Sequence, residues 1–152
     1  MANRVTRTII VKAPVEKAYQ VWANLENFPH FMKNVKSVTP MGDGSTHWKV
    51  KGPLGATVEW DAEITKFEEN KRVGWNTKDR EGNDVTTSGQ VTFLELEQGQ
   101  TEVTVVMQYE PEKGGVAGDV VAKIFTNPEK QLEEDLQNFK KFIEGRQQYS
   151  ER

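Results

Sequence analysis

Six strand-like segments follow one another between Val35 and Pro111, and they constrain the fold more than any other feature of the sequence. Residue types that favour tight turns, chiefly Gly, Asn and Asp, interrupt this stretch five times. The interruptions are residues 42–44, 52–55, 69–71, 79–84 and 98–100. Because each connection is short, consecutive strands have to pair antiparallel. The pattern therefore predicts a six-stranded antiparallel meander.

Alternation of apolar and polar residues within these segments predicts a sheet with one buried and one exposed face. In one strand, the apolar side consists of Val58, Trp60, Ala62 and Ile64, and the polar side of Glu59, Asp61 and Glu63. The last strand repeats this arrangement, with Val103, Val105, Met107 and Tyr109 opposite Glu102, Thr104 and Gln108. We expect both apolar sets to face the core.

A further strand and a short helix precede the meander. Residues 4–12 alternate apolar with polar side chains, which predicts a first strand. Pro14 ends it and is well placed in the first turn of a helix. Apolar residues then recur at three- and four-residue steps and predict an amphipathic helix: Val15, Ala18, Trp22 and Leu25. Residues 27–32 are expected to add another helical turn.

The chain is expected to finish in a long helix from about Val116 to Gly145. Thr126-Asn127-Pro128-Glu129 divides it, because Pro128 removes one backbone hydrogen bond and crowds the preceding turn. A kink or short break is predicted there, with Thr126 and Glu129 spaced as a capping box for the second half. The apolar stripe of that half consists of Leu132, Leu136, Phe139 and Ile143.

These elements predict a hollow. Seven strands about 4.8 Å apart make a sheet roughly 30 Å wide, whereas one helix is only about 10–12 Å across. The sheet therefore has to curl around the long helix, as twisted sheets do. Either aromatic side chains or a ligand fill the space between them. Small or polar residues on the inward register beside Trp60 and Trp75 favour a ligand: Ala62, Thr77, Thr87 and Gly89.

Composition limits the classes of function. The chain has 152 residues, 20 Lys and Arg against 23 Asp and Glu, and no cysteine. We expect a single domain, 1–152, without disulfides or thiolate metal sites. The slight negative charge and the absence of a basic stripe argue against nucleic-acid binding. Apolar runs are far shorter than the ~20 residues that span a bilayer, so we expect no integral membrane segment and a cytoplasmic protein.

Few residues are candidates for catalysis or metal binding. His30 is predicted to lie at a rim or cap, and His47 to face water beside Lys49 and Lys51. The carboxylates of Glu59, Asp61 and Glu63 are expected on a solvated face, so we predict no metal site, no cofactor and no catalytic set. The glycine-rich residues 113–118 lack a phosphate-loop ending and suit a hinge at the pocket mouth. Leu54 is either a gate there or part of an ordinary turn.

Two segments resemble a known family. Val11 to Met32 fits the pattern (V/S)xxPVExAYxVWxxLENFPxFM, and the stretch from Gly114-Gly115 through Pro128-Glu129 to Leu132–Phe142 continues the likeness. The chain resembles the START-like superfamily, also labelled SRPBCC, and within it the polyketide cyclase/dehydrase branch. The resemblance implies an α+β helix-grip fold: a seven-stranded curved antiparallel sheet around a long C-terminal helix, with two short helices after the first strand. It implies a cavity for apolar guests such as lipids, polyketides or steroids, but not catalysis.

The preferred hypothesis is therefore a domain that binds or carries a small apolar or amphipathic, lipid- or polyketide-like molecule. Its sheet wall is predicted to consist of Trp60, Trp75, Val91, Val105, Met107 and Tyr109, and its lid and helix wall of Phe28, Met32, Val121 and Phe125. Thr77, Thr87 and the Tyr109 hydroxyl are expected to orient a polar end. The alternatives are a polyketide-type cyclase or dehydratase, which needs an acid or base in the pocket, and a protein-interaction module without a small ligand.

Overall fold

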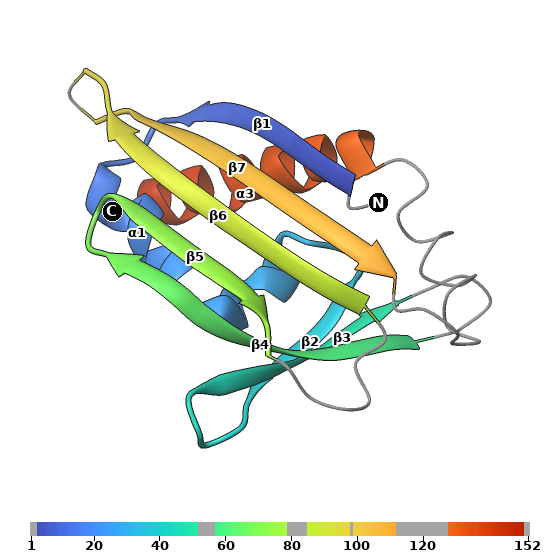
Figure 1. Ribbon diagram of the computed structural model, residues 1–152. Coiled ribbons are helices and arrows are strands. Elements are labelled where there is room, and N and C mark those ends of the chain that lie inside the picture. The colour runs from blue at the N-terminus through green and yellow to red at the C-terminus, as the bar shows by residue number, and fades with distance from the viewer. Residues whose placement is uncertain (1–2, 52–56, 79–84, 98, 112–127, 151–152) are drawn as a thin grey trace.

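The structure is a computed structural model that describes residues 3–51, 57–78, 85–97, 99–111 and 128–150 (Figure 1). Its elements in chain order are β1 (Asn3–Val11), α1 (Val15–Ala23), the 3-10 helix η1 (Leu25–His30), β2 (Val35–Pro40), β3 (Ser45–Lys51), β4 (Thr57–Glu68), β5 (Arg72–Thr77), β6 (Val85–Glu95), β7 (Thr101–Pro111) and α3 (Pro128–Ser150). The two short helices follow the first strand, as predicted.

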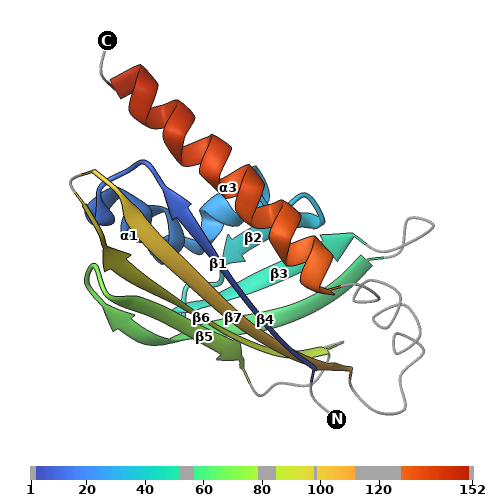
Figure 2. The same ribbon diagram turned by 90° about the horizontal axis from the view of Figure 1, so that it is seen from above.

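The seven strands form one antiparallel sheet in the order β1-β7-β6-β5-β4-β3-β2. The predicted six-stranded meander is confirmed, and β1 joins it by pairing with β7 at the edge (Figure 1). Seen from above, α3 lies across one side of the curved sheet, with α1 and η1 on that same side (Figure 2). This arrangement confirms the predicted fold class.

The buried face of β4 ends earlier than the alternation predicts. Val58, Trp60 and Ala62 are buried as expected, but Ile64 is 36% exposed. The pairing of β4 with β5 shifts register between Ile64 and Lys66. A β-bulge inserts an extra residue and turns the strand, so side chains beyond it change face. Ile64 itself precedes the shift and is the direct partner of the buried Trp75, so it keeps the predicted face although it is partly exposed. The alternation ends with the bulge after it, which leaves no trace in a local sequence pattern.

Gly89 lets the ring of Trp75 lie flat against strand β6. The two residues are direct partners in the β5–β6 ladder. A Cβ atom on Gly89 would stand 2.7 Å from Cε2 and 2.9 Å from Cη2 of that ring, distances at which carbon atoms overlap. The indole is 2% exposed and has no free space on the sheet side. Glycine at this position therefore sets where Trp75 sits on the inner face.

Replacing Gly89 by alanine should lower the free energy of unfolding by about 1–3 kcal/mol, the usual cost of overpacking a core. It should also move the Trp75 ring and change its fluorescence. Gly145→Ala is the matched control, because a Cβ atom there meets nothing within 4 Å and alanine favours a helix by up to about 1 kcal/mol. Urea unfolding followed by tryptophan emission measures both variants. Equal stability of the two would contradict the close approach.

Helix α3 differs in its limits from the predicted C-terminal helix. It begins at Pro128, where a missing backbone donor costs nothing, and continues to Ser150 rather than ending near Gly145. The expected first half of that helix and its kink lie outside the described residues. Three polar contacts hold α3 along β1 and the residue after it. Arg7 Nη2 lies 3.2 Å from Glu129 Oε2, and Lys140 Nζ donates to the backbone carbonyl of Ile10 at 3.1 Å. The backbone N–H of Lys12 donates to Glu144 Oε2 at 2.9 Å.

An aromatic cluster fills one part of the space between the sheet and α3. Trp22 is fully buried and lies 5.2 Å from Phe28, 5.2 Å from Phe31 and 5.3 Å from Phe139, measured between ring centres. These separations are those of favourable tilted and edge-to-face ring pairs. The cluster joins α1, η1 and α3 into one core. The hollow predicted from the width of the sheet is thus partly occupied by the protein's own rings.

Candidate functional site

The rest of the hollow is an open pocket. It has a volume of about 90 Å³, whereas one buried water needs only about 10–15 Å³. Pockets for drug-sized ligands have volumes of about 300–1,000 Å³, so this space suits a small molecule or one end of a longer one. The residues that line it are Val5, Met32, Asn34, Val35, Trp48, Val50, Trp60, Trp75, Thr87, Met107, Gln108, Gln131, Leu132 and Asp135.

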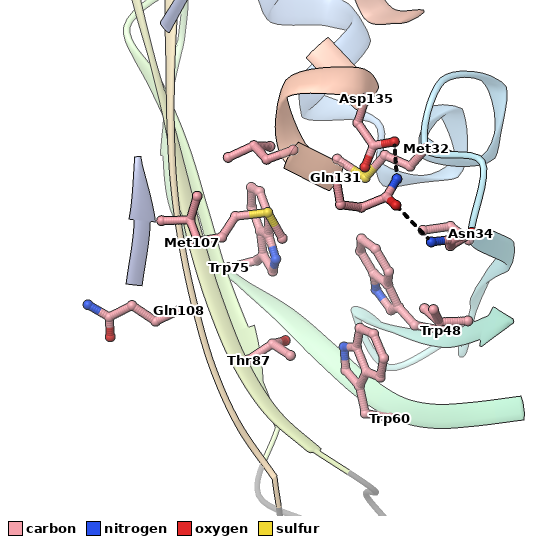
Figure 3. Close-up of a pocket in the computed structure, with 14 residues that line it drawn as sticks. Met32, Asn34, Trp48, Trp60, Trp75, Thr87, Met107, Gln108, Gln131 and Asp135 are labelled. Carbon is pink, nitrogen blue, oxygen red and sulfur yellow. Dashed lines mark hydrogen bonds between the residues drawn. The ribbon is translucent and has the colours of Figure 1, made fainter. Parts of the chain in front are cut away.

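Three indole rings form the sheet side of this pocket (Figure 3). Trp48 and Trp60 are direct partners on β3 and β4 and stack with ring centres 5.7 Å apart. Trp75 on β5 completes the wall beside Met107. Gln108 contributes differently, because its side chain points away on the other side of the sheet (Figure 3). The wall is therefore broad and apolar, which suits planar or hydrocarbon guests.

Five of the twelve residues predicted to bind a ligand lie together around the pocket: Met32, Trp60, Trp75, Thr87 and Met107. Phe28, Val91 and Val105 are fully buried in the core and do not line it. Phe28 nevertheless supports the wall, since its ring lies 5.2 Å from that of Trp48 and 5.6 Å from that of Trp75. The side chain of Tyr109, and Val121 and Phe125 as a whole, lie outside the described part of the chain.

The hydroxyl of Thr77 is engaged by the backbone of the neighbouring strand. It accepts a hydrogen bond from the backbone N–H of Thr87 at 2.7 Å and lies 3.2 Å from the carbonyl oxygen of the same residue. The two hydroxyl oxygens are 3.3 Å apart. Thr77 therefore closes the end of the β5–β6 pairing, while Thr87 is the member of the pair that lines the pocket.

Polar groups gather at the α3 end of the pocket. Asp135 is only 8% exposed, and its Oδ1 accepts a hydrogen bond from Gln131 Nε2 at 3.0 Å. Gln131 Oε1 in turn accepts one from Asn34 Nδ2 at 3.2 Å, so a chain of two hydrogen bonds links the three side chains (Figure 3). Burial raises the pKa of Asp135 to about 7, although Gln131 and the backbone N–H of Lys33 favour the ionised form.

The residues that sequence reasoning missed include Trp48, Asn34, Gln131 and Asp135. The sequence could have indicated Trp48, because it alternates with His47 and Lys49, which were assigned to the outer face, and so belongs to the inner face. The sequence could also have indicated Asp135, because it lies three residues after Leu132 and four before Phe139, on the apolar side of the helix. A carboxylate at such a position either finds partners or has a perturbed pKa.

His47 lies on the other face of the sheet, away from the pocket. Its Nε2 is 2.8 Å from Glu59 Oε1 and its Nδ1 is 2.6 Å from Asp61 Oδ1. These hydrogen bonds, first that to Glu59, raise the pKa of His47, and the His47 contact lowers the pKa of Glu59. His47 is thus on the predicted face, but it is tied to two carboxylates rather than simply facing water. It joins β3 and β4 through these two hydrogen bonds.

His30 is exposed and stacks on Phe142 with ring centres 5.4 Å apart and planes inclined by 6°. It therefore lies at the rim of the fold, between η1 and α3. Within the part of the chain that the structure describes, no group of three His, Cys, Asp or Glu residues is placed to hold a metal ion. None of the helices described is long and apolar enough to cross a membrane.

Comparison with known proteins defines the class to which this fold and pocket belong. The family model for polyketide cyclase/dehydrase and lipid transport proteins matches residues 11–137. The chain therefore belongs to this family, a branch of the START-like (SRPBCC) superfamily, as its sequence pattern implied.

Individual relatives agree with this assignment. The "Uncharacterized 17.2 kDa protein in melC2-rnhH intergenic region" of Streptomyces lincolnensis is 36% identical over 147 residues, which are 96% of this chain and 93% of that one. A crystal structure from Deinococcus radiodurans is 31% identical, with a TM-score of 0.72 over 94% of this chain and 98% of the other. A START superfamily protein from Mycobacterium smegmatis shares the fold at 15% identity, with a TM-score of 0.70 over 93% and 97%.

Proposed function

We propose that the protein binds or carries a small apolar or amphipathic molecule in the pocket between the sheet and α3, and that it does so in the cytoplasm. The observation that carries the proposal is the open space beside the three indoles. Rings from α1, η1 and α3 already fill the neighbouring part of the hollow, yet this part remains free. An empty apolar cavity lowers stability, because its lining loses packing contacts. Such a cost is reasonable where a ligand occupies the space.

The mixture of surfaces in the pocket supports an amphipathic guest. Most of the lining is aromatic or aliphatic, and polar side chains converge from α3 and from the segment before β2. Ligand pockets commonly have this composition, with a few polar groups that fix orientation. Thr87 adds a hydroxyl on the sheet side. We place the hydrocarbon part of the guest against the indoles and its polar end near Asp135.

Blocking the pocket should weaken binding of an apolar dye such as Nile red. Met107 lines the pocket, so Met107→Trp should weaken dye binding at least about tenfold, equivalent to about 1.4 kcal/mol. Val106→Trp is the matched control, because Val106 is adjacent to Met107 on β7 and faces the other side of the sheet. This variant should change the affinity by less than about twofold. Fluorescence titration gives both values. Equal affinities of the two variants, or no dye binding by the wild type, would overturn the proposal.

A second candidate is a cyclase or dehydratase for a polyketide-like substrate, and one observation favours it. The pocket contains a buried carboxyl group, Asp135, whose pKa lies near neutrality. A group of that kind can donate a proton to a carbonyl oxygen or accept one from an adjacent carbon. Turnover of a poly-β-ketone by the wild type, lost in Asp135→Asn without loss of substrate binding, would favour this candidate. Unchanged substrate would favour simple binding.

A further inference from the structure

We propose that the polar end of the pocket selects an uncharged ligand that carries a hydroxyl group, and that it rejects carboxylates, because Asp135 faces the ligand's polar end. This inference rests on the proposed function, since it names the chemical class of the guest in the same pocket. It excludes ionised fatty acids and favours phenols and alcohols.

The geometry leaves Asp135 with capacity for one more partner. Gln131 donates to Oδ1, and the backbone N–H of Lys33 also donates to this carboxyl group. A carboxylate has about four lone-pair sites on its two oxygens. Figure 3 shows the carboxyl group above the pocket, beside the sulfur of Met32. Because Asn34 holds the far side of Gln131, the amide that fixes Asp135 is itself fixed, and the acceptor is preorganised.

A hydroxyl group matches this acceptor in either protonation state. It donates to the ionised carboxylate, and it accepts from the protonated carboxylic acid. A ligand carboxylate has no proton to donate at neutral pH, and two carboxylates at one site repel each other unless one binds a proton. Burial strengthens this repulsion, because screening is weak in the interior. The difference between the two ligand classes should therefore increase as Asp135 ionises.

The charges around Asp135 do not offset this repulsion. Glu134 on the same helix adds negative potential, and Lys33, which precedes β2, adds positive potential. Glu134 Oε2 lies 3.5 Å from Lys33 Nζ, and the two side chains are 42% and 62% exposed, respectively. Their charges therefore largely neutralise each other in solvent. Among the described residues that line the pocket, Asp135 is the one ionisable side chain. The described lining therefore offers no cation that would attract a ligand carboxylate.

The test uses three probes with one ring system: 2-naphthol, 2-naphthoate and naphthalene. Calorimetric titration at pH 6, 7 and 8 gives each dissociation constant for the wild type. At pH 8 we expect 2-naphthol to bind at least about tenfold more tightly than 2-naphthoate. Between pH 6 and pH 8 the affinity for 2-naphthoate should fall by up to about tenfold, the factor for ionising a group whose pKa is about 7. The affinity for 2-naphthol should stay constant within about twofold.

Two variants separate the role of Asp135 from general effects. Asp135→Asn should bind 2-naphthoate with an affinity independent of pH and close to that for 2-naphthol. Glu133→Gln is the matched control, because Glu133 is exposed on the same helix and should retain the wild-type pattern. If all three probes bind the wild type equally at every pH, this inference is wrong and the proposed function stands. If none of the three binds, the proposed function fails and this inference fails with it.

Discussion

Replacing Phe139 by alanine is expected to lower the free energy of unfolding by about 3–5 kcal/mol. The ring is fully buried and lies 5.3 Å from that of Trp22 and 5.4 Å from that of Phe31. It is the point at which α3 joins the aromatic cluster of α1 and η1. Truncation removes both ring contacts and enlarges a hollow that is already partly empty. The surrounding rings cannot collapse into the gap, because the sheet fixes one wall.

Phe142→Ala provides the matched control for this prediction. Phe142 lies three residues further along α3, is only partly buried and stacks on the exposed His30. Its loss should cost about 1–2 kcal/mol, because part of its surface is in water in the folded state already. Urea unfolding monitored by circular dichroism measures both variants. Equal costs would mean that the aromatic cluster does not hold α3 on the sheet.

Asp135 should make the free energy of unfolding of the wild type decrease as the pH rises, and Asp135→Asn should remove this dependence. The pKa of Asp135 is about 7 in the folded protein and 3.8 when free of its surroundings. The folded state therefore holds this proton more tightly. Its contribution is complete below pH 4 and is lost as the pH rises through 7. The shift corresponds to roughly 4 kcal/mol between those limits.

At pH 8 we expect Asp135→Asn to be more stable than the wild type by on the order of 2 kcal/mol. The gain is smaller than the full shift, because the amide still buries a polar group beside the pocket. Unfolding in urea at several pH values from 4.5 to 8.5 gives the difference, which should fall by roughly 3 kcal/mol from pH 8 to pH 4.5, where the variant should be the less stable of the two. The free energy of unfolding of Glu133→Gln should differ from that of the wild type by the same amount at every pH. A variant that is less stable at pH 8 would mean that the carboxylate is stabilised by its surroundings.

Much of the fold follows from local sequence patterns. Turn residues between Val35 and Pro111 marked every connection of the meander, and the stripe from Leu132 to Ile143 marked the buried side of α3. The errors have identifiable causes. The bulge after Ile64 depends on pairing between two strands, which a single strand does not encode. The end of α3 beyond Gly145 was missed because glycine commonly terminates helices, whereas here the helix continues through it.

The pocket was harder to predict than the fold. Parity along single strands placed Trp60 and Trp75 on the inner face, but it could not distinguish residues that line a space from those that fill it. Val91 and Val105 share that face and are packed solid. The distinction depends on how the helix and η1 sit over the sheet, which no strand pattern contains. Asp135 was overlooked because polar residues on helices were assigned to solvent, without testing their position against the apolar stripe.

The four tryptophans provide the most direct test of the pocket. Trp48, Trp60 and Trp75 line it, whereas Trp22 lies behind it in the aromatic cluster. Each indole N–H gives one cross-peak in a ¹H–¹⁵N correlation spectrum, so 2-naphthol can be titrated against all four at once. The account predicts large shifts for the three lining indoles and a small one for Trp22. Three unmoved lining signals at saturating 2-naphthol would contradict it.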